Sequence, residues 1–252
     1  MNATEAKTIV IGGISGGIGS ALAEQLTSHG HRVIGFARSP AALDALRAHL
    51  AEIRTHTCDA TDPQAVDACF ERIITEVGQI DAYVHAIGSI FIKPAHLTSN
   101  QDWADTLTTN LSSAFYALRA ATKQMSKHNS GSCLFFSTAA AQAGIANHEA
   151  IAAAKGGIDA MVRSAAATYA PRGLRINAIA PSLTDTPLAA PMTRHPQALE
   201  ISKKMHPLGD IAQPHDIASL ATWLLSEQAR FVTGQTFTVD GGLSSIVPKP
   251  RV

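Results

Sequence analysis

Short apolar runs alternate with longer amphipathic stretches along nearly the whole chain. The runs that predict buried strands span residues 8–12, 32–37, 53–57, 81–86, 133–137, 174–179 and 235–239. Helical patterns fall between them, near residues 17–29, 40–51, 63–77, 100–127, 148–170 and 215–227. Such alternation is typical of an α/β protein whose parallel sheet has right-handed crossovers and helices on both faces. Ligands of such sheets bind beyond the carboxyl ends of the strands.

A glycine-rich stretch stands between the first predicted strand and the first predicted helix. Residues 12–19 read Gly-Gly-Ile-Ser-Gly-Gly-Ile-Gly. The first turn of a helix carries unpaired N–H groups and the positive end of the helix dipole, which attract phosphate. Gly13, Gly17 and Gly19 fit the spacing G-x-x-x-G-x-G, whereas the long-chain dinucleotide fold has G-x-G-x-x-G. The stretch therefore predicts phosphate binding, with a plain tight turn as the alternative.

The residues at the end of the second predicted strand indicate whether NAD or NADP would be bound. A site specific for NAD places a carboxylate there, to hold the ribose 2′-hydroxyl. This chain has Ala37 at that place, followed by Arg38 and Ser39. A guanidinium holds a 2′-phosphate through two hydrogen bonds. We therefore expect NADP(H) to be preferred, with NAD(H) possible; the alternative is that Arg38 is a solvated residue at the start of a helix.

Composition excludes several classes of protein. The 252 residues are 46% apolar, which suits one large domain with a sizeable core, and 20 basic residues balance 20 acidic ones. Nothing in the charge favours nucleic acid or an anionic membrane as a partner, and no apolar run is long enough to span a bilayer. The polar N-terminus lacks a signal-peptide core, and the scattered cysteines suggest free thiols in a reducing compartment, so we expect a cytoplasmic protein. The histidines lack metal-site spacing, and no metal is expected.

Further motifs follow in a fixed order. The glycine loop is followed by Asp59, Asn110 in Thr-Asn-Leu-Ser, Lys155, Arg-Ile-Asn-Ala-Ile-Ala-Pro at residues 175–181 and Val-Asp-Gly-Gly at residues 239–242. With these motifs the sequence resembles the short-chain dehydrogenase/reductase family over nearly its whole length. The resemblance implies a single Rossmann-type domain of about seven strands, nicotinamide-dependent hydride transfer, a small-molecule substrate and a homo-oligomer, either tetramer or dimer.

The resemblance also implies where the cofactor lies. Residues 181–186 would lie against the nicotinamide carboxamide, with Ser182 where the family usually has glycine. Lys155 would hold the ribose hydroxyls. Asp59 would contact the adenine, or else it contributes only to the cap of the following helix. The implied cofactor-binding residues are Gly13, Ser15, Gly17, Ile18, Gly19, Arg38, Ser39, Asp59, Ala86, Gly88, Lys155, Pro181, Thr184 and Thr186.

The catalytic set departs from the family at one position. The family uses Asn, Ser, Tyr and Lys, with the tyrosine four residues before the lysine. Asn110 and Lys155 match, and the serine position falls on Thr138, but the tyrosine position is Ile151. Isoleucine neither donates nor accepts a proton, whereas the family's tyrosine protonates the carbonyl oxygen. We therefore expect an altered proton donor, since the chain's three tyrosines all lie within other predicted elements.

His148 is the candidate replacement. It lies three residues before Ile151 and seven before Lys155, so one face of the predicted helix carries all three. An imidazole titrates near neutrality and relays protons. The alternative is that Asn147 caps the helix and His148 is an exposed first-turn residue. The candidate catalytic residues are Asn110, Thr138, His148 and Lys155.

Two stretches resemble the enoyl-acyl carrier protein reductase branch of the family. That branch places its tyrosine seven residues before the lysine, which here is His148. Val-His-Ala-Ile-Gly at residues 84–88 is also similar to its Val-His-Ser-Ile-Gly. The alternatives to reduction of a small or acyl carbonyl are therefore an enoyl-thioester reductase, and a cofactor-binding sensor or partner subunit without turnover. The segment near 187–209 is expected to be a lid over an apolar pocket, or a packing surface.

Overall fold

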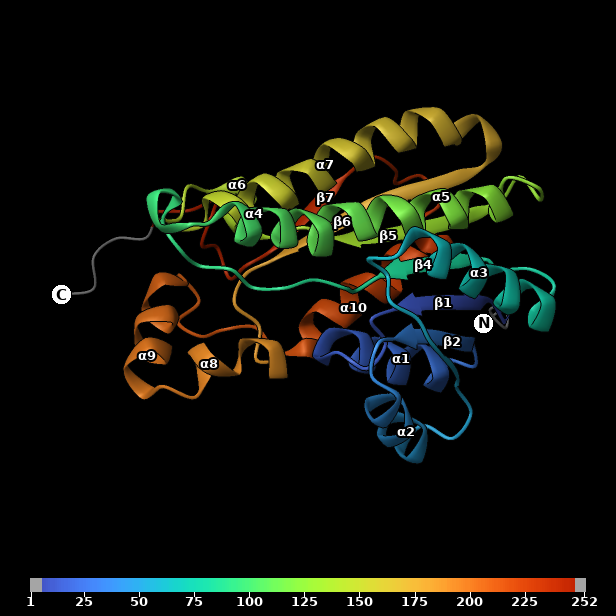
Figure 1. The fold of residues 1–252 in the computed structure, drawn as a ribbon, viewed down its shortest axis with the longest axis horizontal. Coiled ribbons are helices and arrows are strands. Elements are labelled where there is room, and N and C mark those ends of the chain that lie inside the picture. Colours follow the sequence, from blue (N-terminus) through green and yellow to red (C-terminus); the bar gives the residue numbers. More distant parts are fainter. Residues whose placement is uncertain (1–5, 248–252) are drawn as a thin grey trace.

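A seven-stranded parallel sheet runs through the molecule between two layers of helices (Figure 1). The computed structural model describes residues 6–247. The strands are β1 (Thr8–Gly12), β2 (Arg32–Ala37), β3 (Arg54–Thr57), β4 (Ala82–His85), β5 (Gly131–Phe136), β6 (Leu174–Pro181) and β7 (Thr236–Val239). All seven predicted strands are therefore confirmed, with end points that shift by at most two residues.

The strand order places a ligand-binding crevice in the middle of the sheet. The order is β3-β2-β1-β4-β5-β6-β7, so the chain runs outward from β1 to β3 and then returns to the other side of β1. In the register, Ile9 of β1 lies between Val33 of β2 and Ala82 of β4. The reversal between β1 and β4 is the point where doubly wound sheets bind their ligands.

Each face of the sheet carries its own hydrophobic core. Helices α3, α5 and α7 cover one face, and α1, α2 and α10 cover the other (Figure 1). Because successive side chains of a strand point to opposite faces, both cores draw on the same strands. The helices are α1 (Gly17–Ser28), α2 (Pro40–His49), α3 (Pro63–Val77), α4 (Asn100–Leu107), α5 (Ser113–Met125), α6 (Ala139–Gln142), α7 (Glu149–Tyr169), α8 (Ala190–Thr193), α9 (Pro196–Met205) and α10 (Pro214–Leu225).

The helix predicted over residues 100–127 is wrong in one respect, because a π turn over Thr108–Ser112 separates α4 from α5. A π turn displaces backbone carbonyls from the regular helical ladder and is common at functional sites. Here Ser113 Oγ donates to the Thr109 carbonyl at 2.6 Å and lies 3.1 Å from His85 Nε2. Asn110 sits within the turn and is fully buried.

The start of α7 also differs from the prediction. The N-cap is His148, not Asn147, and the helix begins at Glu149. Asn147 adopts a left-handed conformation with φ of 65°, and its carbonyl accepts a hydrogen bond from Lys93 N at 2.8 Å. His148 therefore occupies the N-cap position of α7, but its side chain makes no capping hydrogen bond to the backbone.

Two short helices, α8 and α9, extend beyond the carboxyl edge of the sheet (Figure 1). They lie in the segment expected to be a lid or a packing surface. Each has a proline within its first two positions, which suits a residue without an N–H group near a helix start. Neither helix contains a buried residue. Among residues 6–247, no helix is both long and apolar enough to cross a bilayer, and the three cysteines are buried free thiols.

Candidate active site

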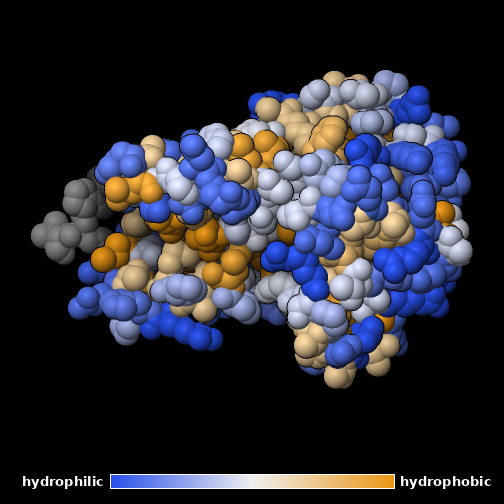
Figure 2. All heavy atoms as spheres, in the orientation of Figure 1, coloured by the Kyte–Doolittle hydropathy of each residue, from blue (hydrophilic) through white to orange (hydrophobic). Residues whose placement is uncertain are grey.

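A cavity of about 370 Å³ opens at the carboxyl ends of β4, β5 and β6. Figure 2 shows apolar side chains gathered in a hollow between the α8–α9 segment and the layer that contains α4 and α7. Polar side chains line it from the loop after β4, the end of β5, the start of α7, the segment after β6 and the end of α9: Ser89, Ser137, Thr138, His148, Lys155, Ser182, Thr184, Thr186, Ser202 and His206. Its apolar wall includes Ile90, Ile92, Ile145, Ile151, Leu183, Leu188, Met192, Met205 and Leu243. The segment predicted as a lid or packing surface therefore lines the pocket.

Lys155 provides the buried positive charge of the site. Its side chain crosses from α7 to the end of β5, where Nζ donates to the Phe136 carbonyl at 2.8 Å. Burial lowers the pKa of Lys155 to about 8, while the charge of Asp159 opposes the shift. One N–H of the ammonium group is thus hydrogen-bonded to a carbonyl, and the other two remain available to a ligand in the pocket.

Gly88 lies against Lys155 and Asn110 on the loop after β4. A Cβ atom at Gly88 would stand 3.0 Å from Asn110 Oδ1 and 3.3 Å from Lys155 Nζ, so a larger residue would crowd both groups. Asn110 Oδ1 accepts from Ser89 N at 2.9 Å, and its Nδ2 donates to Ser89 Oγ and the Thr106 carbonyl. The structure thus brings together two candidate catalytic residues, but the Asn110 amide is engaged in holding the loop after β4.

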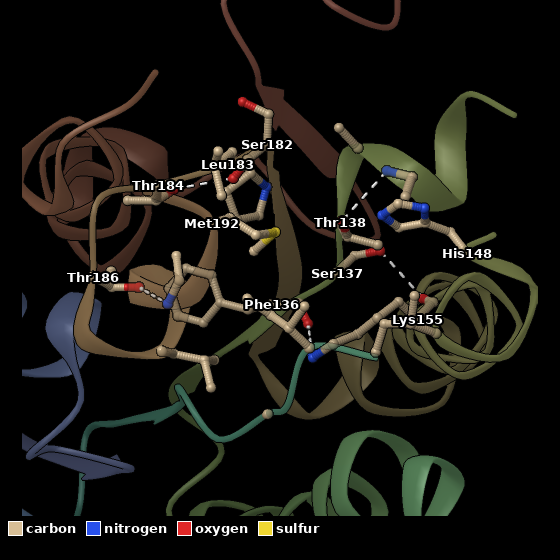
Figure 3. Close-up of a pocket in the computed structure, with 18 of the residues that line it drawn as sticks. Phe136, Ser137, Thr138, His148, Lys155, Ser182, Leu183, Thr184, Thr186 and Met192 are labelled. Carbon is tan, nitrogen blue, oxygen red and sulfur yellow. Dashed lines mark hydrogen bonds between the residues drawn. The ribbon is translucent and has the colours of Figure 1, made fainter. Parts of the chain in front are cut away.

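Thr138 and His148 lie on the same side of the pocket as Lys155 (Figure 3). Thr138 Oγ1 accepts from Ala140 N at 3.3 Å as the cap of α6, which leaves its hydroxyl proton free. His148 Nδ1 is 2.7 Å from the Ala146 carbonyl. A carbonyl only accepts, so Nδ1 carries a proton and Nε2 is the free nitrogen. Ile151 also lines the cavity, so the predicted shared face of the helix does border the pocket.

Ser137 is directed away from the reacting region. It is buried, and its Oγ donates to the Lys155 carbonyl at 3.2 Å. This bond connects the end of β5 to α7 and so fixes the position of the Lys155 backbone relative to the sheet. Of the two adjacent hydroxyl residues, Thr138 is therefore the one available to a substrate oxygen.

The glycine loop offers backbone groups and no charge of its own. Helix α1 begins at Gly17 with no side-chain cap and no acidic residue in its first turn, so its N–H groups are open to a phosphate. Gly13 has a φ of 79°, a conformation that glycine adopts without strain. Gly17 faces Thr186, because a Cβ atom there would lie 2.6 Å from Thr186 Cγ2. The loop thus meets the segment after β6. Of the other implied residues here, Ser15 and Gly19 belong to the same loop, and Ile18 lines the cavity.

Arg38 and Asp59 meet at the ends of β2 and β3. Arg38 is exposed, and Ser39 caps α2 by accepting from Ala42 N at 3.2 Å. Asp59 Oδ1 accepts from the Thr61 N–H and hydroxyl, and these bonds together with the charge of Arg38 lower the pKa of Asp59. The cap of α3 is Asp62 and not Asp59.

Pro181, Thr184 and Thr186 lie on the segment that leaves β6, and all three line the cavity with Ala86. Thr184 pairs with Ala212 in an isolated bridge, and Thr186 Oγ1 caps the turn that follows. In Figure 3, Thr184, Thr186 and Met192 stand across the pocket from Lys155 and His148. A bound nicotinamide group between these two sides would meet side chains from both.

The pair formed by Ser182 and His206 was missed by sequence reasoning. His206 is 4% exposed, with Nδ1 2.6 Å from the Ser202 carbonyl and Nε2 2.8 Å from Ser182 Oγ. The two residues are 24 positions apart, and nothing in the sequence links them. Only the substitution of serine for the family's usual glycine hinted at position 182. Within residues 6–247, no group of three His, Cys, Asp or Glu side chains is placed to hold a metal ion.

Comparison with known proteins supplies the family. A family profile described as "Enoyl-(Acyl carrier protein) reductase" matches residues 13–244. The chain is 33% identical to cis-4-hydroxycyclohexanecarboxylate dehydrogenase of Sinomonas cyclohexanicum, over 95% of this chain and 97% of that protein. The chain belongs to the short-chain dehydrogenase/reductase family.

Further relatives are consistent with this placement. D-threitol dehydrogenase of Mycolicibacterium smegmatis is 31% identical over 94% of this chain and 93% of its own. The crystal structure of levodione reductase superposes with a TM-score of 0.91 at 27% identity, covering 96% of this chain and 98% of that one. The protein is thus a short-chain oxidoreductase that acts on a small molecule with a nicotinamide cofactor.

Proposed function

We propose that the protein is an NADP(H)-dependent reductase that transfers hydride to or from a small or acyl carbonyl compound, with an altered proton donor. The observation that carries the proposal is Lys155. Its ammonium group reaches the wall of an apolar cavity beside Gly88, and Thr138 and His148 line the same side. One buried charge and two hydrogen-bonding side chains in an otherwise apolar pocket suit a reaction in which negative charge develops on oxygen.

The residues present fit a nicotinamide dinucleotide. The open N–H groups of α1 would donate to a diphosphate, Arg38 would pair with the 2′-phosphate, and Lys155 would hold the ribose hydroxyls. Thr184 and Thr186 lie across the pocket and face the carboxamide side. When bound, the nicotinamide supplies or accepts the hydride. The exposed guanidinium of Arg38, with no carboxylate at Ala37, supports preference for the phosphorylated cofactor.

The proton is the unusual part of the proposal. Ile151 borders the pocket where the family's tyrosine is expected, and its side chain has no proton to give. His148 replaces that function through Nε2, because the Ala146 carbonyl holds the ring by Nδ1. Thr138 donates a hydrogen bond from its free hydroxyl to the substrate oxygen and stabilises the charge that forms there. A proton passes from the imidazolium to that oxygen as hydride arrives at carbon.

An enoyl-thioester substrate is the second candidate, favoured by Ile151. Hydride addition to an activated alkene forms an enolate, which needs stabilisation at oxygen but no acid positioned in the tyrosine's place. Thr138 and the charge of Lys155 supply that stabilisation. The protonation at carbon that follows can be performed by water, so this reaction tolerates the isoleucine better than carbonyl reduction does.

The size of the pocket favours compact substrates. A cavity of about 370 Å³ is at the small end of the range for ligand sites, roughly 300–1,000 Å³. The relatives named above act, by their names, on a polyol, a hydroxylated cyclohexane acid and a cyclic dione. A screen of NADPH oxidation against cyclic and linear ketones and enoyl thioesters tests the proposal. We expect turnover in at least one class, and binding of NADPH without turnover in any class would contradict it.

We further propose a homo-oligomer, a tetramer or a dimer, built on α7 together with α4 and α5. Small residues crowd α7, and they permit close approach of a second helix. Part of this pattern serves the chain itself, because Gly157 packs against Leu111 of the π turn. Gly156 has open space beside it and remains free for a partner. Light scattering at micromolar concentration should give a mass above 26.4 kDa, and a monomer would contradict the proposal.

A further inference from the structure

We propose that Ser182 and His206 form a second polar recognition site, which binds a hydroxyl group on the apolar body of the substrate, away from the reacting carbon. This inference rests on the proposed function in one respect: it takes the side of the pocket with Lys155 as the reacting end. The substrate class that it defines is a compact carbonyl compound or alcohol with one further hydroxyl group.

The hydrogen bonds of His206 determine what the pair offers to a ligand. The Ser202 carbonyl accepts from Nδ1, so the proton of the neutral ring resides there. Nε2 then carries a lone pair, and the Ser182 hydroxyl donates to it at 2.8 Å. With its proton committed, Ser182 Oγ presents lone pairs to the cavity. The pair therefore accepts a hydrogen bond, and a substrate hydroxyl is the neutral group that donates one.

The surroundings hold His206 in this orientation. The ring packs against the turn after β7, since a Cβ atom at Gly241 would lie 3.6 Å from His206 Cδ2. The Asp240 carboxylate in that turn accepts from Gly242 N at 2.9 Å and Ser244 N at 2.7 Å. Those bonds hold the carboxylate within the turn, and both ring nitrogens of His206 keep the partners described above.

The acceptor oxygen of Ser182 should make the pocket select hydroxylated substrates over purely apolar ones. Ser182 and His206 line the cavity together with Leu183, Met205 and Leu243, which offer no hydrogen bond. A purely apolar substrate would cover the Ser182 oxygen without giving it a partner, and a buried acceptor without a partner is unfavourable. A hydroxyl at the same place satisfies it. The hydroxyl of Ser182 thus distinguishes substrates that differ by one oxygen atom.

The test compares matched pairs of ligands. The probes are 3- and 4-hydroxycyclohexanol and the corresponding 3- and 4-methylcyclohexanols, which have similar volume but lack the second oxygen. Dissociation constants are measured by saturation-transfer NMR, with and without NADP⁺, on the unmodified protein and on Ser182→Ala. The quantity compared is the ratio of the dissociation constant of the hydroxy ligand to that of the methyl ligand. A change of this ratio in Ser182→Ala reports the interaction between the Ser182 hydroxyl and the ligand hydroxyl.

We expect Ser182→Ala to shift that ratio by about two- to tenfold against the hydroxy ligand for at least one ring position, as one neutral hydrogen bond implies. Ser182→Thr keeps the hydroxyl and should retain the ratio. Ser202→Ala is the matched control, because this serine also lines the pocket but its hydroxyl donates to Ala198 O at 2.9 Å. It keeps the carbonyl that holds His206 and should leave the ratio unchanged.

A second measurement does not depend on any variant. In protein labelled with ¹⁵N-histidine, the Nε2 resonance of His206 should move on addition of the hydroxy ligand and not of the methyl ligand. An unchanged ratio in Ser182→Ala at both ring positions would overturn the inference. So would a fall in kcat for plain cyclohexanone in Ser182→Ala, because the pair would then act at the reacting oxygen. A protein without turnover whose binding ratio still shifts would refute the proposed function and leave this inference standing.

Discussion

The two walls of the pocket are built in different ways. One wall is formed by the glycine loop, the loop after β4, the end of β5 and the start of α7. Bonds between these stretches hold its side chains, such as that from Lys155 Nζ to the Phe136 carbonyl. The opposite wall, from Ser182 to His206, is made by a segment that leaves the sheet, forms α8 and α9 and returns to meet its own beginning. The first wall carries Lys155, Thr138 and His148, which we propose to act at the reacting end. The second carries the Ser182–His206 pair, which we propose to recognise the body of the substrate.

The largest effect should come from restoring a phenol on the first wall. Ile151→Tyr should raise kcat/KM for simple ketones by about 10²–10⁴-fold, the usual contribution of a positioned acid. Lys155 is already in place to support the phenol, and residue 151 already borders the cavity. Steady-state NADPH oxidation with cyclohexanone measures the change. Ile151→Phe supplies the ring without the hydroxyl, and an equal gain in that variant would show that packing and not proton donation is responsible.

Removing His148, the proposed replacement for the tyrosine, should lower the rate of carbonyl reduction. His148→Ala should lower carbonyl reduction by about 10²-fold or more while NADPH affinity is unchanged, since the ring touches no predicted cofactor residue. His128→Ala, on the distant loop after α5, is the control for loss of an imidazole. If His148→Ala reduces ketones as fast as the unmodified protein, the acid has been placed wrongly.

Replacing Lys155 should cause a comparable loss of turnover, and the activity that depends on this residue should vary with pH. Burial lowers the pKa of Lys155 to about 8, so its charge is lost as pH rises through that value. We expect kcat/KM to fall on the alkaline side with an apparent pKa near 8. Lys155→Gln should lower turnover by about 10²–10³-fold and abolish that limb of the profile.

The same group has a consequence for stability. In an unfolded chain the lysine keeps its ordinary pKa of 10.5, so between about pH 8 and 10.5 the unfolded chain binds more protons than the folded protein. The lysine's contribution to the free energy of unfolding therefore rises with pH in that window. Urea unfolding at pH 7.5 and 10 should show this rise in the unmodified protein but not in Lys155→Gln. A Lys155→Gln protein with the same pH dependence as the unmodified one would contradict the shift.

The smallest effect concerns Arg38, which follows β2 and lies outside the lining of the pocket. NADPH should bind more tightly than NADH, and Arg38→Ala should remove most of the difference, about ten- to a hundredfold for a charge-assisted pair. Arg47, on the helix α2 that follows Arg38, is an exposed arginine paired with Asp44, and Arg47→Ala is the matched control. Titration of both cofactors by fluorescence measures the effect, and equal affinities in the unmodified protein would refute the preference.

The contrast between the walls also explains what was predictable. Apolar runs encode the strands locally, so all seven strands followed from the sequence. The glycine spacing and Arg38 predicted a phosphate site, and Lys155 was indicated by the family resemblance alone; their roles remain predictions. The π turn was not predictable, because residues 100–127 have a continuous helical pattern. The turn is accompanied by a bond from Ser113 Oγ to the Thr109 carbonyl and by a contact of Ser113 with the distant His85.

The second wall depends on contacts between distant residues. Ser182 and His206 meet only because α9 ends beside the turn after β7, and no spacing or periodicity encodes that meeting. The engagement of the Asn110 amide with Ser89 was missed for the same reason. Local pattern therefore specifies the strands and the glycine loop, whereas tertiary packing specifies how the side chains around the pocket are paired.

Transfer of a labelled hydride tests the central proposal most directly. NADPH carrying deuterium at the transferable C4 position is mixed with excess protein and with the ketone and enoyl-thioester panels, and the products are analysed by mass spectrometry and NMR. The account predicts one deuterium per product molecule, on the carbinol carbon of a ketone or the β-carbon of an enoyl thioester, and a rate that falls in Lys155→Gln. Deuterium that stays on a bound cofactor across the whole panel would contradict it.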